Sequence, residues 1–232
     1  MESGRAEPAA PLAMLIVRST VVGPFAENTL LLGDTESGAA ILVDPGGELA
    51  RVAAMLEPGG FRVTRIVLTH GHIDHVAGCA EAKRTFGAPS QMHAADAPWI
   101  DVVPQQAEMF GFDGARERPE IDRFHEDGEE FPVGEHTCRV IHTPGHSRGS
   151  CCLLFEKARV LVAGDTLFAG SVGRTDLPGG DFGDLERSIR ERLFPLGDDL
   201  RFYPGHGPSA LLGDERRTNP FVGEATRRGR FP

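Results

Sequence analysis

The chain has 232 residues, 34 acidic against 24 basic side chains, and a formal net charge of -10. That charge argues against nucleic acid as the main partner, because binding to phosphates needs a basic face. No apolar run approaches membrane-spanning length, and the first residues lack the pattern of a signal peptide, so we expect no membrane contact and a cytoplasmic location.

Alternating apolar residues dominate the first part of the chain and predict strands. We expect these strands at 14–22, 28–34, 39–43 and 63–69, with a short one at 90–94. Apolar residues at helical spacing predict two helices, at 48–56 and 75–86.

The middle of the chain, residues 98–120, has little regular pattern and mixes aromatic groups with prolines and glycines. Two interpretations fit it: a lid or insertion that faces a substrate, or an ordinary surface connection. Beyond it we expect a hairpin at 129–143, strands at 150–156, 159–165 and 200–206, and an amphipathic helix at 183–194. This order predicts an α/β (α+β) fold with mixed sheets. We take 14–222 as one domain between flexible tails at 1–13 and 223–232.

The cysteines give no sign of a thiolate metal site, because none of them forms a C-x-x-C pair. We expect small buried thiols, which suit a reducing compartment. Two are adjacent in a predicted strand and should point to opposite faces. The four are Cys79, Cys138, Cys151 and Cys152.

The stretch "IVLTHGHIDHVAG" (66–78) places three of the chain's nine histidines and one aspartate directly after a predicted strand. In extended backbone, His70 and His72 face the same way and can converge on one point. Asp74 and His75 follow as the chain turns into a helix, so they can face a second point nearby. Neutral imidazoles and a carboxylate suit zinc, iron or manganese. A solvated polar turn would crowd these groups without a shared role.

Three later segments repeat one form, in which a strand leads through a glycine-bearing turn to a ligand-type side chain. "RVIHTPGHS" offers His142 and His146, "RVLVAGDTLF" offers Asp165, and "LRFYPGHGP" offers His206. Each glycine lets the backbone turn tightly and approach a site.

Together "THGHIDH", "HTPGHS", "AGDTLF" and "YPGHGP" resemble the metallo-β-lactamase fold superfamily, over essentially all of residues 14–222. "LFAGSVGRTDLPGGD", "PLGDD" and "RTNPF" further resemble the short, glyoxalase II-like (hydroxyacylglutathione hydrolase-like) enzymes of bacteria. The resemblance implies an αββα four-layer sandwich with two divalent metal ions at one edge, zinc first, with iron or manganese as alternatives.

The resemblance also implies the role of each ligand. His70, His72 and His146 would hold one metal, Asp74, His75 and His206 the other, and Asp165 would bridge both. Asp74 could also accept a proton. A metal-bridging hydroxide would then attack a small-molecule thioester, an S-acyl-glutathione such as S-lactoylglutathione, or a related ester.

Other readings of the sequence remain open. Longer glyoxalase II enzymes grip glutathione with a C-terminal helical domain, whereas this chain ends soon after "RTNPF". Persulfide dioxygenases resemble the chain at "GRTD" and at His70, His146 and Asp165, which would hold a single iron. A metal-binding scaffold without activity is a third reading.

Some polar residues are not assigned to the metals, and for two of them two roles are possible. Arg174 could contact an anionic group of the substrate or pair with Asp176. His142 could orient a ligand or pack at a strand end. The remaining histidines are expected at the surface or hydrogen-bonded in the core: His93, His125 and His136.

Overall fold

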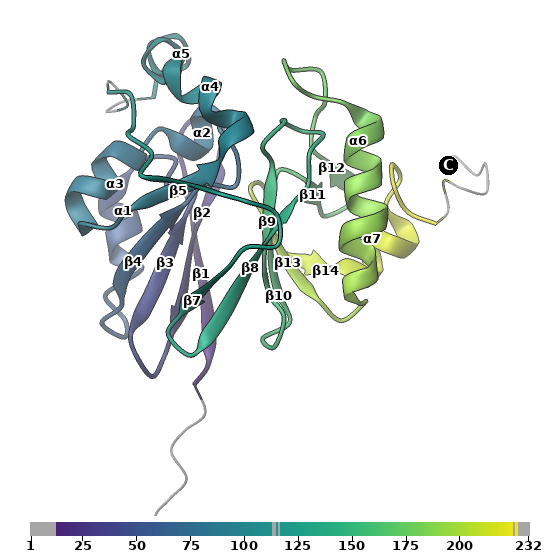
Figure 1. Cartoon of the computed structure of the whole chain (residues 1–232), viewed down its shortest axis with the longest axis horizontal. Coiled ribbons are helices and arrows are strands. Elements are labelled where there is room, and N and C mark those ends of the chain that lie inside the picture. The colour runs from purple at the N-terminus through teal and green to yellow at the C-terminus, as the bar shows by residue number, and fades with distance from the viewer. Residues whose placement is uncertain (1–12, 113–114, 116, 225, 227–232) are drawn as a thin grey trace, which may run out of the picture.

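The computed structural model describes residues 13–112, 115, 117–224 and 226, and shows two mixed sheets packed face to face with helices on both outer sides (Figure 1). This confirms the predicted mixed-sheet class. The first sheet has the strand order β1-β2-β3-β4-β5-β6, antiparallel from β1 to β3 and parallel from β3 to β6. Its strands are β1 Leu15–Val22, β2 Glu27–Asp34, β3 Ala39–Val43, β4 Arg62–Val67, β5 Ser90–His93 and β6 Arg123–His125.

The second sheet has the order β14-β13-β10-β9-β8-β7, in which only β10 and β13 run parallel. Its strands are β7 Glu130–Val133, β8 His136–His142, β9 Cys151–Phe155, β10 Val160–Gly164, β13 Arg201–Pro204 and β14 Ala210–Leu211. A small separate ribbon pairs β11 Leu167–Phe168 with β12 Ser171–Val172.

Helices cover the outer face of each sheet, as Figure 1 shows. On the side of the first sheet lie α1 Leu49–Ala54, α2 Ile73–Val76, α3 Cys79–Phe86, α4 Ala97–Asp101 and α5 Val103–Phe110. On the side of the second lie α6 Phe182–Arg187 and α7 Leu212–Thr218. α6 continues through a wide helical turn at Ser188–Leu193 into a tighter one at Phe194–Leu196. No helix among the described residues is long and apolar enough to cross a membrane.

Apolar side chains fill three layers, one between the sheets and one under each set of helices. Cys151 packs in the layer between the sheets, whereas Cys152 packs under the helices of the second sheet. The prediction that they point to opposite faces is therefore confirmed. All four cysteines are buried, and burial raises the pKa of each thiol.

The structure departs from the predicted elements in a few places. The helix predicted at 75–86 is two helices, α2 and α3, that meet at Gly78. There the backbone approaches another loop so closely that a Cβ on Gly78 would lie 2.7 Å from the carbonyl oxygen of Pro45. Residues 98–120, where little pattern was visible, contain most of α4 and all of α5. β6, β11, β12, β14 and α7 were not predicted. The predicted tails lie largely outside the described residues.

Candidate metal centre

The loops that follow β4, β8, β10 and β13 meet at one end of the sandwich and are joined by backbone hydrogen bonds. The amide of Cys151 donates to the carbonyl of Thr69 over 2.8 Å, which links the two sheets. The amide of Gly205 donates to the carbonyl of Gly164, also over 2.8 Å, which aligns the last two loops. Side chains that are far apart in sequence therefore share one small volume.

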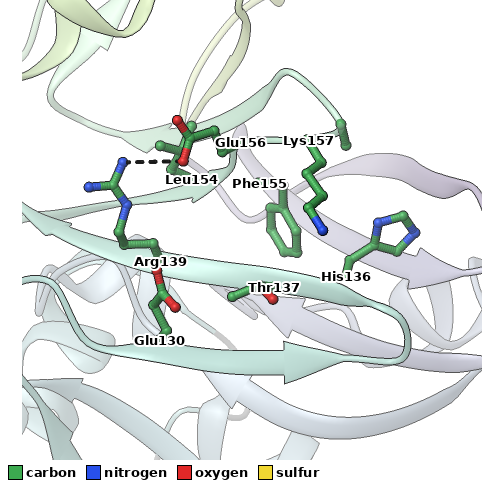
Figure 2. A pocket seen from close by; sticks show the side chains of 9 residues that line it. Glu130, His136, Thr137, Arg139, Leu154, Phe155, Glu156 and Lys157 are labelled. Carbon is green, nitrogen blue, oxygen red and sulfur yellow. Dashed lines mark ion pairs between the residues drawn. The ribbon is translucent and has the colours of Figure 1, made fainter.

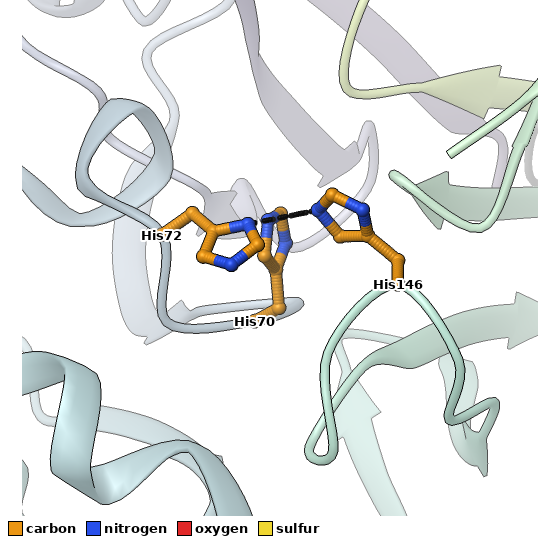
Figure 3. A group of neighbouring side chains, drawn as sticks. All are labelled: His70, His72 and His146. Carbon is orange, nitrogen blue, oxygen red and sulfur yellow. Dashed lines mark hydrogen bonds between the residues drawn. The ribbon is translucent and has the colours of Figure 1, made fainter. Parts of the chain in front are cut away.

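The first group of ligand-type side chains is His70, His72 and His146, which point toward one another from two loops (Figure 3). His146 Nε2 lies 2.8 Å from His72 Nδ1 and 3.2 Å from His70 Nε2. Ligand atoms about 2.0–2.1 Å from a tetrahedral zinc lie roughly 3.4 Å from one another, so a modest spreading of these nitrogens would admit a cation. All three side chains are buried.

The second group is Asp74, His75 and His206. His206 Nε2 lies 3.1 Å from Asp74 Oδ2, and His75 Nε2 lies 3.7 Å from the same oxygen. Asp165 stands between the two groups, because its Oδ1 is 3.4 Å from His75 Nε2 and its Oδ2 is 3.6 Å from His146 Nε2. All seven side chains predicted as ligands are thus within reach of one or other of two adjoining points.

The pKa values of the histidines shift in opposite directions in the two groups. Burial lowers the pKa of His70 well below its usual value and that of His72 to about 3, so both imidazoles are neutral, as ligation requires. Burial acts the same way on His75, but the carboxylates of Asp165 and Asp74 outweigh it and raise the pKa of His75 well above its usual value. The second group thus attracts positive charge.

Several buried polar atoms have no hydrogen-bond partner among the described residues, and two of these, His75 Nε2 and Asp165 Oδ1, lie 3.4 Å apart at the metal groups. A buried polar atom without a partner is costly, and a cation at this position would satisfy both. The donor set of imidazoles and carboxylates also matches that of zinc, iron and manganese sites. The residues therefore fit a metal centre.

Asp44 supports the predicted ligand His75 through a hydrogen bond on the side of the ring away from the metal groups, and this role was not predicted from the sequence. Its Oδ2 accepts from His75 Nδ1 over 2.9 Å and from Thr69 Oγ1 over 2.6 Å, and its Oδ1 accepts from the Thr69 amide over 2.7 Å. A carboxylate behind a ligating imidazole fixes the tautomer and orientation of the ring. The signal was present, because "ILVDPGG" has the same strand, carboxylate and glycine form as the other motifs.

Asp96 was missed as well, and it ties two of the ligand loops together. Its Oδ2 accepts from the Gly71 amide over 2.9 Å and from Ser147 Oγ over 2.6 Å. Its Oδ1 accepts from the Gly149 amide over 2.7 Å. No local pattern marks this residue, since all its partners are distant in sequence.

A cavity of about 310 Å³ opens beside the two groups. His72, Asp74, His146 and Asp165 form part of its wall. Its apolar side is formed by Phe25, Ile73, Trp99, Phe110 and Leu177. Trp99, Gln106 and Phe110 come from the irregular segment 98–120, which places that segment at the site rather than on an unrelated surface.

Arg174 lines this cavity and is paired with Asp176 through two bonds of 2.7 Å. The pairing lowers the pKa of Asp176 to about 2. The Arg174 carbonyl accepts a bond of 2.8 Å from His146 Nδ1, so this loop orients a predicted ligand. The structural interpretation of Arg174 therefore fits better than contact with an anion.

The other histidines lie outside the two groups. His142 donates from Nε2 to the carbonyl of Arg148 over 2.8 Å and stacks on His93, so it supports the turn that carries His146. His125 is buried, yet neither of its ring nitrogens has a partner among the described residues. The expectation of a hydrogen-bonded core histidine is wrong there, and burial lowers the pKa of His125 to about 3.

His136 lines a separate hollow of about 220 Å³ near the start of β8, far along the strand from the metal groups (Figure 2). Arg139 and Glu156 face each other across its wall at 3.9 Å. None of the predicted ligands borders it.

An αββα sandwich with clustered histidines and aspartates at its strand ends is the architecture of a metallo-hydrolase. Residues 22–206 match the sequence profile of the Metallo-beta-lactamase superfamily, and the chain belongs to that superfamily of metal-dependent hydrolases. The resemblance seen in the sequence is thereby confirmed.

The chain is also similar to individual members of this superfamily over most of their length. Hydroxyacylglutathione hydrolase GloC of Haemophilus influenzae is 36% identical over 208 residues, which cover 87% of this chain and 95% of GloC. The structure of the BLEG-1 B3 metallo-beta-lactamase is similar at a TM-score of 0.82 and 31% identity, covering 89% of this chain and 99% of that one. The structure of TTHA1623 in a di-iron-bound form is similar at a TM-score of 0.78 and 36% identity, covering 88% and 99%.

Proposed function

We propose that the chain hydrolyses a thioester, or a related ester, at a centre of two divalent metal ions. The observation that carries the proposal is the position of Asp165, whose two oxygens face the two groups of ligands at 3.4 and 3.6 Å. A pair of cations, when bound there, lowers the pKa of a shared water toward neutrality and so supplies hydroxide at pH 7.

The chain's own residues hold and orient the reacting parts. His70, His72 and His146 would hold one cation, and the second group would hold the other. His75 and His206 hold the pKa of Asp74 below its usual value although burial opposes this, so Asp74 is a carboxylate at neutral pH. A carboxylate with a lowered pKa is a weak base, which favours its role as a ligand over that of proton acceptor.

Side-chain nucleophiles are poorly placed for this reaction, which supports attack by water. All four cysteines are buried, and burial raises the pKa of Cys79 to about 12 and that of Cys152 to about 11. The reactive form of cysteine is the thiolate, so these thiols are inert at neutral pH. A thioester also releases a thiol of pKa about 8.5, which leaves more readily than an alkoxide.

We propose an S-acyl-glutathione such as S-lactoylglutathione as the substrate, on the similarity to GloC. We further propose zinc as the metal, with iron or manganese as alternatives. The persulfide dioxygenase reading uses only His70, His146 and Asp165. The approach of His72 to within 2.8 Å of His146 favours a larger donor set and hence the hydrolase.

The test is to measure thiol release from S-lactoylglutathione and a panel of other thioesters and esters, with zinc, iron or manganese supplied in turn. Metal content per chain is measured on the same samples, and a β-lactam is included as a further substrate. Two metals per chain and thiol release support the proposal. One iron per chain, with oxygen uptake on glutathione persulfide and no thioester cleavage, would refute the hydrolase and favour a persulfide dioxygenase.

A further inference from the structure

A second hollow, of about 380 Å³, adjoins the cavity at the metal centre. Trp99 lines both, and the neighbouring residues Leu177 and Pro178 line one each. A substrate whose carbonyl lies at the metal groups can therefore extend past the indole into the second hollow. That hollow is mainly apolar, with Pro98, Val102 and Pro178 in its wall, but it also contains the side chain of Arg148.

The backbone at Arg148 is held by neighbouring residues. Its carbonyl accepts from His142 Nε2 over 2.8 Å, and the next amide, that of Gly149, donates to Asp96 over 2.7 Å. The stem of the side chain runs along Gly179, where a Cβ would lie only 3.2 Å from Arg148 Cγ. The backbone is therefore held by two hydrogen bonds, and the loop that carries Gly179 limits where the side chain can lie.

The guanidinium of Arg148 has no hydrogen-bond or acidic partner within the described part of the chain. Most of the arginines that the structure describes are paired with a carboxylate, as Arg174 is with Asp176. The acidic residue in the wall of this hollow, Asp96, already accepts from three donors through its two oxygens. Arg148 is exposed, so its guanidinium is open to a ligand that enters this hollow beside the metal groups.

We propose that Arg148 binds a carboxylate of the substrate, and so selects thioesters that carry an anionic group at some distance from the reacting carbonyl. This inference rests on the proposed hydrolase activity. The arm of the substrate lies along Trp99 and ends at the guanidinium. A planar guanidinium donates two parallel hydrogen bonds to a carboxylate, which gives both strength and orientation.

The kinetic test compares two thioesters that share a phenylacetyl group, one made from 6-mercaptohexanoate and the other from 6-mercaptohexanamide. We expect Arg148→Gln to lower kcat/KM for the anionic thioester about tenfold, mainly through KM, and to leave the neutral one unchanged. Arg148→Lys should restore part of the loss. The matched control is Arg62→Gln, which removes an exposed arginine that also has no ion pair among the described residues, at the far end of β4. Equal losses for both thioesters, or no loss, would overturn the proposal.

A binding test separates this inference from the hydrolase itself. Trp99 is the only tryptophan in the chain, so its fluorescence reports directly on both hollows. The metal-loaded protein is titrated with 6-phenylhexanoate and with the neutral 6-phenylhexanamide. We expect Arg148→Gln to weaken binding of the carboxylate about tenfold and not that of the amide. Should no thioester be cleaved, the proposed function fails, yet this titration still decides the role of Arg148. A carboxylate affinity that Arg148→Gln leaves unchanged would refute it.

Discussion

Replacing Asp44 with asparagine should weaken one metal position while leaving the fold intact. Asp44 accepts from His75 Nδ1 and from both the hydroxyl and the amide of Thr69. Asparagine keeps one oxygen and turns the other acceptor into an NH₂ donor, which must then face an existing donor. The loss of one bond to a charged acceptor lowers the free energy of unfolding by about 1.5–3 kcal/mol.

The same change should lower affinity for the cation held by His75 about 10–100-fold, the usual effect of removing a partner behind a metal ligand. That range corresponds to about 1.4–2.7 kcal/mol of binding free energy. The assay is competition with a chelator, with metal per chain measured at each point. We expect one of two metals to be released at lower chelator concentration, while the other follows the wild type.

Asp34→Asn is the matched control for this experiment. Asp34 is also a buried aspartate that accepts several hydrogen bonds, from Ser37, Glu36 and Glu135, but it lies at the opposite end of the sandwich. It should destabilise the fold without changing metal affinity. Wild-type affinity in Asp44→Asn, or an equal loss in the control, would refute the role given to Asp44.

Three further outcomes follow from the structure. His146→Ala should lower thioester hydrolysis at least about 100-fold, because even residues behind the ligands typically count for 10–100-fold, and should reduce the metal content on direct analysis. Phe155→Ala removes a fully buried ring between the sheets and should lower the free energy of unfolding in urea by about 3–5 kcal/mol. Burial opposes ionisation of Asp34, but its hydrogen bonds hold its pKa below the usual value, so its stabilisation is present above about pH 4 and lost on further acidification. The difference in unfolding free energy between wild type and Asp34→Asn should therefore shrink as the pH falls, and a constant difference would contradict this.

Local sequence carried most of the information about the metal groups. Each predicted ligand follows a strand through a turn, and the motifs together resemble a family whose fold brings such turns to one edge. That resemblance implied, from the sequence alone, that His70, His146, Asp165 and His206 share one site. The opposite orientation of Cys151 and Cys152 could be predicted as well, because successive side chains of a strand point to opposite faces of the sheet.

The surroundings of the centre could not be predicted in this way. Asp96 and Arg148 matter through contacts with residues far away in sequence, and no period or spacing encodes such contacts. Trp99 lies in a segment whose prolines obscured the helical pattern of α4 and α5. The break at Gly78 likewise depends on a loop more than thirty residues upstream.

The hydrogen bond from Cys151 to Thr69 lies on the seam, the boundary between the first and the second sheet. The predicted ligands come from both sides of this boundary. Asp74 and the histidines of 70–75 belong to the first sheet's loop, and the remaining ligands belong to the second sheet's loops. A cation held by donors from both sheets would link the two sheets, and its binding free energy would add to the stability of the folded protein. Loading the protein with metal should then raise its melting temperature, and should slow amide exchange at this end of the seam more than around Asp34.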